Sequence, residues 1–277
     1  MEQTVTAKVK KITSSQAEVV DDVVVVEEPL EIQLSFVNGG RRVIRSVSVT
    51  MRTPGKDNEL AVGFLYTEGI LKNPEDVEEV SELENNKICV VLRDAIKVDF
   101  NQLSRHFYTS SSCGVCGKTS LAALKMGNAQ PFKGATPILE QGFICKMPTL
   151  LRKHQQTFAK TGGLHAAALF NTSGKIQLSN EDVGRHNAVD KVAGSILLDS
   201  SLDPAESILM VSGRTSYEIL QKSIRAGIPF VAAVGAPSSL AVELANVFNV
   251  TLLGFLSEER FNVYSAPERV LAITAQA

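Results

Sequence analysis

Apolar and polar residues alternate along much of the first fifty positions, a pattern typical of β-strands with one buried face. The alternation is regular over residues 30–36, and it resumes over residues 43–49. Asn38-Gly39-Gly40 lies between the two runs, and glycine readily adopts the left-handed backbone conformations of tight turns. We therefore predict a β-hairpin within residues 23–52, with its polar positions facing outward.

A helical spacing of apolar residues follows this hairpin. Asp57 or Asn58 is a candidate N-cap, because a short side-chain oxygen can accept a hydrogen bond from a free backbone N–H of the first turn. The residues that fall near one face of the predicted helix are Leu60, Ala61, Phe64, Leu65 and Leu71. A further strand is predicted at residues 88–93.

Strands and helices alternate in the second half of the chain. The predicted strands are residues 164–170, 175–179, 207–211, 230–234 and 251–255, with helices after the second, third and fourth. This alternation is typical of a layered α/β domain with largely parallel strands. The fold class is therefore α/β, or α+β when the whole chain is considered. We expect a β-rich N-terminal domain over residues 1–126, a linker over residues 127–147 and an α/β domain over residues 148–277.

Composition restricts the classes of partner. The 28 basic and 30 acidic residues give a net charge of −2, and no basic block indicates binding to a nucleic-acid backbone. No apolar run approaches the roughly 18 residues that suggest a membrane span. We therefore expect neither nucleic acid nor a membrane as a partner. Residues 1–16 lack the apolar core of a secretory signal, which predicts a cytoplasmic protein.

Cys113 and Cys116 are separated by two residues within a Ser-, Thr- and Gly-rich segment, whereas Cys89 and Cys145 stand alone. In a reducing compartment such a pair favours metal binding, redox or sulfur chemistry over a structural disulfide. If Ser112 caps a helix, the free N–H groups of its first turn stabilise a thiolate, which can attack a sulfur donor. If the glycines keep the segment a loop, the pair suits the transfer of sulfur between partners.

Three other interpretations of the cysteine pair stay open at this level. A closed zinc site needs four ligands, and the sequence holds no second CxxC or closely spaced HxxxH. A dithiol redox motif of the thioredoxin kind follows a strand and opens a long helix, whereas this pair follows a long polar loop. An inert pair is the third possibility. Sulfur carriage is the interpretation that these comparisons favour.

The segment after residue 180 predicts a helix with chemistry at its start. Asp182 is a candidate cap for this helix. Its predicted buried stripe consists of Val189, Val192, Ala193, Ile196 and Leu197. His186 and Asp190 lie four residues apart at the edge of the stripe, where the carboxylate can orient the imidazole. The alternative is that these two residues only form the edge of the polar face of the helix.

Two turns that follow predicted strands are candidate anion sites. Gly213-Arg214-Thr215 follows one strand, and Gly235 follows the next. Parallel sheets bind ligands beyond the carboxyl ends of their strands, where free backbone N–H groups and an arginine can receive a phosphate. Neither turn matches a Walker or GxGxxG pattern, and ordinary Ser/Thr capping is the alternative.

Five short motifs follow one another along the chain. They are Ser-Ser-Cys113-Gly-Val-Cys116-Gly, Thr161-Gly-Gly-Leu-His165-Ala-Ala-Ala, Glu181-Asp-Val-Gly-Arg185-His186-Asn-Ala-Val-Asp190-Lys191, Ser212-Gly213-Arg214-Thr215-Ser-Tyr217-Glu218 and Arg260-Phe-Asn-Val-Tyr264-Ser265. In this combination and order they resemble the FdhD/NarQ family of formate dehydrogenase accessory proteins. The resemblance extends over residues from about 43 to about 267. Each motif by itself has only modest specificity for the family, but the five motifs in this order are highly specific.

The resemblance implies a sulfurtransferase required for formate dehydrogenase activity. It implies that Cys113 accepts sulfur from a cysteine desulfurase and holds it as a persulfide, while Cys116 assists its transfer. The implied acceptor is a molybdenum cofactor of the bis-guanine-dinucleotide form, before that cofactor is inserted into formate dehydrogenase. A homodimer and a C-terminal three-layer α/β/α domain like the cytidine deaminase fold are also implied.

A cofactor-binding segment after the last long strand is implied too: Phe255, Leu256, Ser257, Glu258, Glu259 and Arg260. Relatives commonly carry a basic residue and glycines there, and two carboxylates beside a diphosphate would repel it. Either Glu258 and Glu259 point away and leave Arg260 and backbone amides to bind, or the cofactor is held differently. The other candidate cofactor-binding residues are His165, Arg185, His186, Asp190, Gly213, Arg214, Thr215 and Gly235.

Rival functions belong to other classes. A cofactor chaperone would bind the molybdenum cofactor at the same turns without covalent sulfur transfer. A dithiol oxidoreductase would cycle a disulfide between Cys113 and Cys116. A zinc deaminase is not expected, because Asn187-Ala188 follows His186 where H-x-E is required, and no CxxC follows Cys145. No zinc and no metal ligand are therefore assigned.

Overall fold

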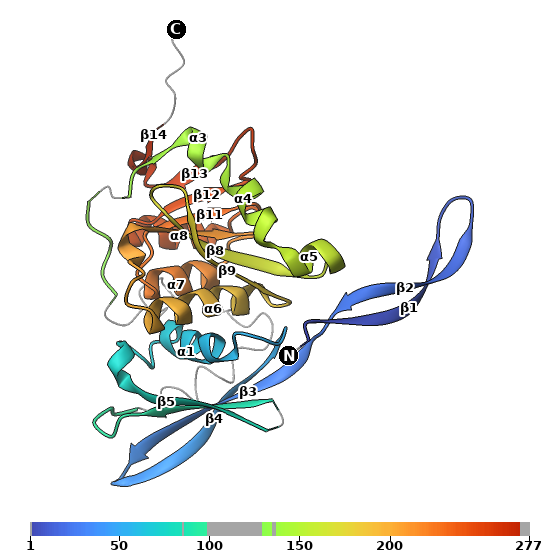
Figure 1. Ribbon diagram of the computed structural model, residues 1–277. Helices are drawn as coiled ribbons and strands as arrows, with labels where there is room; N and C mark the ends of the chain where they lie inside the picture. The colour runs from blue at the N-terminus through green and yellow to red at the C-terminus, as the bar shows by residue number, and fades with distance from the viewer. Residues whose placement is uncertain (1, 85, 99–128, 135–136, 272–277) are drawn as a thin grey trace.

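The computed structural model of the chain describes residues 2–84, 86–98, 129–134 and 137–271. A two-stranded hairpin of β1 (Thr4–Ile12) and β2 (Ala17–Val25) projects from a body that contains two larger sheets (Figure 1). The first sheet has four strands in the order β4-β3-β6-β5, and the second has six in the order β13-β12-β11-β10-β8-β9. The segment that carries Cys113 and Cys116 lies outside the described residues.

The four-stranded sheet contains β3 (Glu28–Asn38), β4 (Arg41–Arg52), β5 (Val77–Leu83) and β6 (Lys87–Leu92). The predicted hairpin is confirmed, because β3 and β4 pair antiparallel around Gly39 and Gly40, whose φ angles are 59° and 76°. The predicted strand at residues 88–93 is confirmed as β6. Alternate apolar residues of β3, including Ile32 and Leu34, are fully buried beneath α1 (Asp57–Thr67).

The predicted capping of α1 is wrong. Lys56 occupies the N-cap position in a left-handed conformation, and no side chain caps the helix. Asp57 is instead the buried partner of Arg52, whose Nε and Nη2 atoms lie 3.1 and 2.9 Å from its carboxylate oxygens. A fully buried guanidinium needs such a bidentate partner. The Asp57 carboxylate therefore binds Arg52 at the end of β4 and does not cap the helix. Leu71 lies beyond the end of the helix but belongs to the same core.

The six-stranded sheet is mixed, and the prediction of largely parallel strands is wrong. Its strands are β8 (His165–Asn171), β9 (Ile176–Asp182), β10 (Ser207–Val211), β11 (Phe230–Ala233), β12 (Thr251–Gly254) and β13 (Asn262–Ser265). Only β10–β11 and β11–β12 pair parallel, and each of these pairs is joined by a crossover helix. A short turn joins β8 to β9 and a short loop joins β12 to β13, and such connections permit only antiparallel pairing.

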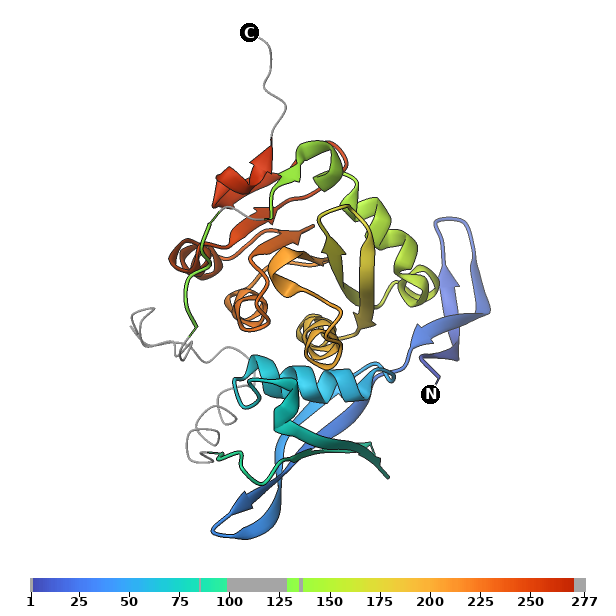
Figure 2. The ribbon, with the colours of Figure 1, turned by 60° about the vertical axis from the view of Figure 1, so that its left-hand side comes forward.

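Helices cover both faces of the six-stranded sheet (Figure 2). One face packs against α6 (Arg185–Leu198), α7 (Tyr217–Arg225) and α8 (Ser239–Phe248), and the other packs against α3 (Gln141–Ile144) and α4 (Met147–His154). The predicted apolar stripe of α6 is confirmed, since all five of its residues are buried. The predicted cap is wrong, because Asp182 ends β9 and Gly184 occupies the N-cap position.

The remaining helices, strands and turns of the described chain are short. Residues 139–147 form β7 (Leu139–Glu140), α3 and the start of α4, and they bury Leu139, Ile144 and Met147 against the sheet. The other elements are α5 (Gln156–Thr161), β14 (Val270–Leu271) and the 3₁₀ turns η1 (Pro74–Asp76), η3 (Pro204–Glu206) and η4 (Pro267–Arg269). In the described part of the chain, no helix is long and apolar enough to cross a membrane.

The two halves of the body meet where α1 crosses α6 (Figures 1 and 2). A Cβ atom on Gly63 of α1 would lie 1.8 Å from the carbonyl oxygen of Asp190, and one on Gly194 of α6 would lie 1.9 Å from that of Glu59. Only glycine at both positions allows the two backbones to approach this closely. The face of α1 that does not contact α6 covers the four-stranded sheet.

Gly63→Ala is expected to destabilise the protein by about 3 kcal/mol or more, because the added methyl group forces the two helices apart in a packed core. Urea unfolding, followed by circular dichroism, measures the change. Gly142→Ala is the matched control, since a Cβ atom on Gly142 meets nothing within 4 Å. Equal stability of the two variants would contradict the close crossing of α1 and α6.

Candidate functional site

Two turns meet at the carboxyl ends of β10 and β11. The Gly235 N–H donates to the Gly213 carbonyl oxygen over 3.0 Å, and the Thr215 N–H donates to the Ala236 carbonyl oxygen over 3.3 Å. The Phe255 N–H, at the end of β12, donates to the Gly235 carbonyl oxygen over 3.1 Å. Three segments that are far apart in the sequence therefore lie side by side at this edge of the sheet, as expected for the turns after parallel strands.

Glycine allows close approach at both turns. A Cβ atom on Gly235 would lie 3.0 Å from the backbone nitrogen and Cα of Arg214. A Cβ atom on Gly213 would lie 3.3 Å from Nδ1 of His165. The first contact brings the two turns together, and the second places the imidazole of His165 directly against the first turn.

Basic groups from three elements gather around this edge. His165 begins β8, Arg185 and His186 begin α6, and Arg214 belongs to the turn after β10. Burial lowers the pKa of His165, and the charges of Arg185 and His186 lower it further. The imidazole of His165 is therefore neutral at pH 7, while the two guanidinium groups keep their charge.

His186 pairs with Glu218 and not with Asp190, so the predicted pairing of His186 is wrong. Nε2 of His186 lies 3.1 Å from Oε2 of Glu218, and Ser216 Oγ donates to the same carboxylate over 3.3 Å. The hydrogen bond from His186 lowers the pKa of Glu218. Glu218 is a residue of this site that the sequence did not assign, because its partner lies on another helix.

Asp190 lies away from the sheet edge, in the interface of α1, α6 and α7. It is 2% exposed, and both of its carboxylate oxygens lie 2.9 Å from Nζ of Lys222. The Thr67 hydroxyl donates to Asp190 over 2.7 Å and accepts from Lys222 over 3.0 Å. Burial by itself lowers the pKa of Lys222, but Asp190 and Glu68 outweigh it and hold that pKa above its usual value. In this structure the Asp190 carboxylate binds Lys222 and Thr67, and its assignment to the cofactor site stays a prediction.

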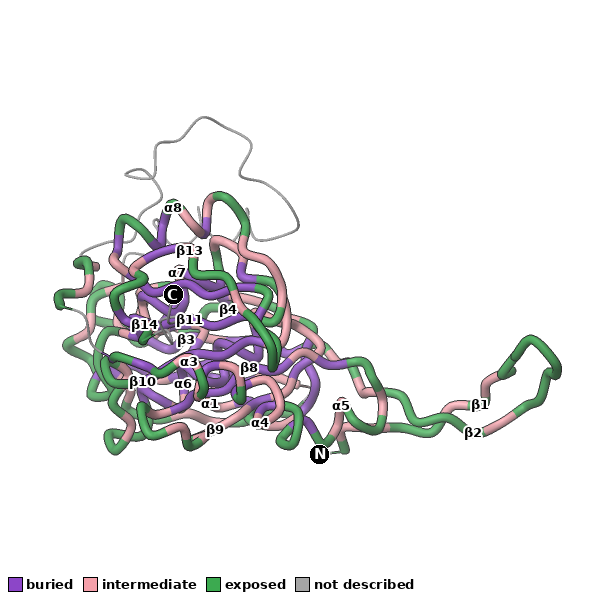
Figure 3. The backbone as a smooth tube through the Cα atoms, turned by 90° about the horizontal axis from the view of Figure 1, so that it is seen from above, coloured by how far each residue is buried: buried purple, intermediate pink, exposed green. Residues whose placement is uncertain are grey.

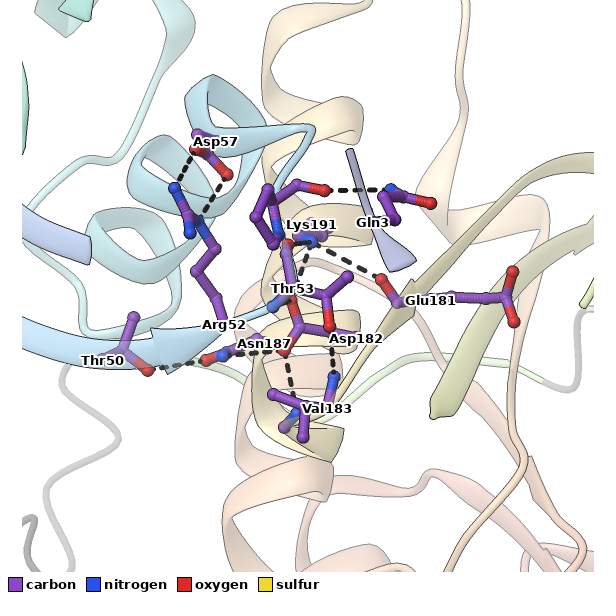
Figure 4. A network of polar contacts seen from close by, with 12 residues as sticks. Gln3, Thr50, Arg52, Thr53, Asp57, Glu181, Asp182, Val183, Asn187 and Lys191 are labelled. Atoms are coloured by element: carbon purple, nitrogen blue, oxygen red, sulfur yellow. Dashed lines mark hydrogen bonds and ion pairs between the residues drawn. The ribbon is translucent and has the colours of Figure 1, made fainter. Parts of the chain in front are cut away.

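The start of α6 is fixed by a second buried ion pair (Figure 4). Asp182 and Lys191, 0% and 1% exposed, lie 2.7 Å apart. Asp182 also accepts from the backbone N–H of Thr53, and Nζ of Lys191 donates to the Thr53 carbonyl oxygen over 3.0 Å. The amide of Asn187 donates to both Met51 and Asp182. These bonds tie β4 to the turn that positions Arg185 and His186.

Two buried polar atoms near the edge have no hydrogen-bond partner among the described residues. They are Oγ1 of Thr215, a residue that is 1% exposed, and Nε of Arg185. Buried polar groups are nearly always satisfied by protein, water or ligand. Together with the two guanidinium groups and the glycine turns, they fit an anionic ligand that carries several oxygen acceptors.

The segment after β12 lies beside the two turns. Phe255 has a φ of 53° and is 46% exposed, whereas Leu256 is 2% exposed and packs into the core. Such a φ is uncommon outside glycine and raises the energy of the backbone. The Glu258 carboxylate accepts a hydrogen bond from Thr149 of α4. The two expectations for how the acidic pair accommodates a cofactor stay predictions.

A pocket of about 380 Å³ opens beside His165, between the sheet and α4–α5. Its lining includes Leu151, Arg152, Phe158, Leu164, His165 and Ser212. The Arg152 guanidinium lies 4.9 Å from the ring centroid of Phe158. The pocket thus offers an apolar wall, a cation and an imidazole. No sequence pattern predicted it, since its lining comes from three segments.

The cysteines divide into two groups. Cys113 and Cys116 lie outside the described residues. Cys89 is buried, and burial and the charge of Glu79 raise its pKa, which makes it a poor nucleophile. Cys145 is partly buried. Within the described ranges, no group of three or more His, Cys, Asp or Glu side chains could hold a metal ion.

Comparisons with known proteins agree on one family. The family model described as the FdhD/NarQ family matches residues 25–271. The chain is 43% identical to the sulfur carrier protein FdhD of Sulfurisphaera tokodaii, covering 95% of this chain and 98% of that protein. It is 44% identical to the protein of that name from Mycolicibacterium paratuberculosis, covering 98% and 100%. A crystal structure from Desulfotalea psychrophila, described as that of a formate dehydrogenase accessory protein, matches with a TM-score of 0.76 and 28% identity, covering 98% and 100%.

The lowered pKa of His165 predicts a pH dependence of stability. The unfolded chain takes up a proton at this histidine as the pH falls through about 6.5, and the folded chain does so only at lower pH. The His165 contribution to stability is therefore complete above that pH and declines below it. Arg185→Gln is expected to raise the pKa of His165 toward its usual value, as measured by NMR titration of the imidazole. Lys175→Gln, which removes a charge at the end of β8 opposite to His165, is the control, and an equal effect of both variants would contradict the assignment.

Asp190→Asn is expected to destabilise the fold by about 3–5 kcal/mol, because it leaves the buried ammonium of Lys222 without its counter-ion. Urea unfolding measures the loss. Adding Lys222→Met removes the uncompensated charge, and the double variant is expected to regain part of the stability. An Asp190→Asn protein as stable as the wild type would show that Asp190 is not needed for this interface.

Proposed function

The chain belongs to the FdhD/NarQ family, and on this premise we propose that it is a sulfur carrier that supports the maturation of formate dehydrogenase. The observation that carries the proposal is its identity of 43–44%, over nearly the whole chain, to proteins named sulfur carrier protein FdhD. The match to a formate dehydrogenase accessory protein supports the link to that enzyme. The CxxC motif supplies the nucleophile that such a carrier needs.

The sulfur is carried on Cys113 as a persulfide. The Cys113 thiolate attacks the terminal sulfur of a persulfide on a cysteine desulfurase, and the thiolate of the desulfurase leaves. One S–S bond forms and one breaks, so this exchange needs no external oxidant or reductant. Cys116 assists the onward transfer. Cys89 is unsuited to this role because it is buried and its pKa is raised.

The acceptor is the molybdenum cofactor in its bis-guanine-dinucleotide form, a substrate whose metal takes the sulfur as a ligand before insertion into formate dehydrogenase. The sheet edge is the part of the described chain that fits its phosphates. Arg185 and Arg214 would hold the anionic oxygens. Thr215 Oγ1 and Arg185 Nε, both buried and unpartnered among the described residues, supply further donors. The segment Phe255–Arg260 would meet the nucleotide, with the ring of Phe255 exposed beside Gly235.

A cofactor chaperone without covalent sulfur transfer is the second candidate. The same donors at the sheet edge favour it, because they bind an anion whether or not sulfur moves. The two candidates differ only at the cysteines. Sulfur loading of Cys113 is therefore the property to measure first.

Incubation with an active cysteine desulfurase and cysteine is expected to add the mass of one sulfur atom to the full-length protein. The gain should be lost on treatment with a thiol, and it should be absent from Cys113→Ser. Intact-protein mass spectrometry under non-reducing conditions measures it. Cys89→Ser is the matched control and is expected to load like the wild type.

Two outcomes would contradict covalent carriage on Cys113. No gain in the wild type, with the desulfurase shown to be active, would favour the chaperone. Undiminished loading of Cys113→Ser would place the sulfur on another residue. Either result leaves the cofactor site at the sheet edge standing.

A further inference from the structure

The pocket beside His165 contains a buried side chain without a hydrogen-bond partner among the described residues. We call this cavity, which α4, α5 and residues 162–165 line together with Ser212 and Val234, the α5 pocket. Gln155 lines it and is 5% exposed, and its side-chain amide forms no hydrogen bond within the described part of the chain. Buried amides are nearly always bonded to protein, water or ligand. An unpaired amide that lines a cavity therefore indicates a ligand.

The walls of the α5 pocket suit a flat ring. The Arg152 guanidinium lies over the ring of Phe158, 4.9 Å from its centroid. Guanidinium groups and aromatic rings both stack on planar heterocycles. The apolar side chains of the wall are Pro148, Leu151, Leu164 and Val234. A ring that enters the pocket would thus stack on a charged plane and cover apolar side chains.

Three polar groups line the same pocket. The amide of Gln155 offers a donor beside an acceptor, and the neutral imidazole of His165 offers one of each. Ser212 Oγ accepts from the Ala166 N–H over 2.8 Å and donates to none of the described residues, so its hydroxyl proton is available to a ligand. The amide matches a ring edge on which an N–H lies beside a C=O. Guanine and pterin, the two fused rings of the proposed acceptor, both carry such an edge.

The strand order gives the position of the α5 pocket along the sheet edge. β8, β10, β11 and β12 are neighbours in that order, so the residues at this edge follow one another as His165, Gly213, Gly235 and Phe255. The α5 pocket lies toward the β8 end, and none of its described lining residues belongs to β12 or to the segment that follows it. Phe255 lies at the β12 end. With neighbouring strands about 4.8 Å apart, the two ends are separated by roughly 14 Å across the glycine turns.

The proposed acceptor has a shape that matches this order. Each of its nucleotide units has guanine at one end, the metal-binding pterin at the other end and a diphosphate between them. A diphosphate held by Arg185 and Arg214 beside the two turns therefore directs the two ring systems toward opposite ends of the sheet edge. The guanine end is proposed to meet the segment after β12, and the pterin then extends toward the α5 pocket.

Other parts of the fold hold α5 in place. The Glu181 carboxylate, at β9, accepts from the backbone N–H groups of Thr157 and Phe158 over 3.0 and 2.7 Å, which caps α5. The Thr157 hydroxyl donates to the side chain of Gln3 over 3.1 Å, and β2 lies beside α5 (Figures 1 and 3). The base of the β1–β2 hairpin thus supports the wall that carries Phe158. A wall fixed in this way lowers the entropy cost of binding a ligand.

We propose that the α5 pocket binds the pterin of the molybdenum cofactor, with the N–H and C=O edge of the ring on Gln155 and its face against Arg152 and Phe158. The inference rests on the proposed function, because it takes the cofactor as the sulfur acceptor and its guanine as the group that meets Phe255. It adds the orientation of the acceptor on the protein. The pterin end, which carries the metal, lies beside His165, and the guanine end lies at β12.

Two titrations of the full-length protein test this orientation, one with 6-hydroxymethylpterin followed by its fluorescence and one with GDP followed by calorimetry. Gln155→Leu is expected to weaken pterin binding about tenfold or more, because the N–H and C=O edge loses both partners, and to leave GDP binding unchanged. Arg152→Ala, at an exposed position, is expected to weaken pterin binding about threefold. Arg214→Ala is expected to weaken GDP binding and to leave pterin binding unchanged.

Gln156→Leu is the matched control, because it makes the same change at the next residue, which is exposed and does not line the α5 pocket. Its affinity for both probes is expected to equal that of the wild type. Urea unfolding separates recognition from a structural role. Gln155→Leu removes an unpaired buried amide and is expected to be at least as stable as the wild type, whereas a structural role for Gln155 predicts a loss of stability.

Equal pterin affinity of Gln155→Leu and Gln156→Leu would overturn the proposal, and so would a wild type that does not bind the pterin. GDP binding that Gln155→Leu weakens would place the guanine in the pocket and overturn the orientation. If Gln155→Leu does not fold, a pterin affinity that Arg152→Ala leaves unchanged has the same meaning. Failure of the proposed function is a separate result, namely a wild type that gains no sulfur from an active desulfurase.

Discussion

The close crossing of α1 and α6 is the contact on which the rest of the structure depends. Gly63 and Gly194 let the two backbones approach within a distance that no other residue pair would allow. One face of α1 then covers the four-stranded sheet, and the opposite face of α6 covers the six-stranded sheet. Leu197 of α6 belongs to the core of the first sheet, so the two halves share their packing. The β-rich half thereby positions the helix that begins with Arg185 and His186.

Two buried ion pairs hold this crossing in register. Asp182–Lys191 joins the end of β9 to α6 and, through Thr53, to the segment after β4, and Asp190–Lys222 joins α6 to α7 and, through Thr67, to α1. Removing such groups from water costs several kcal/mol per ion, which is recovered only when each lone pair and proton finds a partner. Here the backbone and hydroxyl groups of Thr53 and Thr67 supply those partners. The pairs therefore specify one arrangement of the helices more than they add stability.

Local patterns in the sequence predicted most of the helices and strands. They did not predict which side chains of different elements pair with each other. The glycine turn of β3–β4 and the apolar stripe of α6 depend on neighbouring residues and were correct. His186 and Asp190 have the spacing of a helical pair, yet each binds a residue that the fold brings from α7. Spacing predicts which side chains can meet on one helix, and burial then decides whether another charge competes for them. Glu218 and Lys222 are such competitors.

The charge balance at the sheet edge decides what it can bind. Arg185 and Arg214 are positive, and His165 is neutral because burial and its basic neighbours lower its pKa. The Glu218 carboxylate is engaged by His186, and that of Glu258 accepts a hydrogen bond from Thr149. The net charge of the chain is −2, but the two arginines make this edge locally positive. Salt screens the repulsion between an anion and the acidic residues elsewhere in the chain beyond about 8–10 Å. A phosphate-bearing ligand is attracted only at short range, so its recognition depends on the position of α6 and therefore on the glycine crossing.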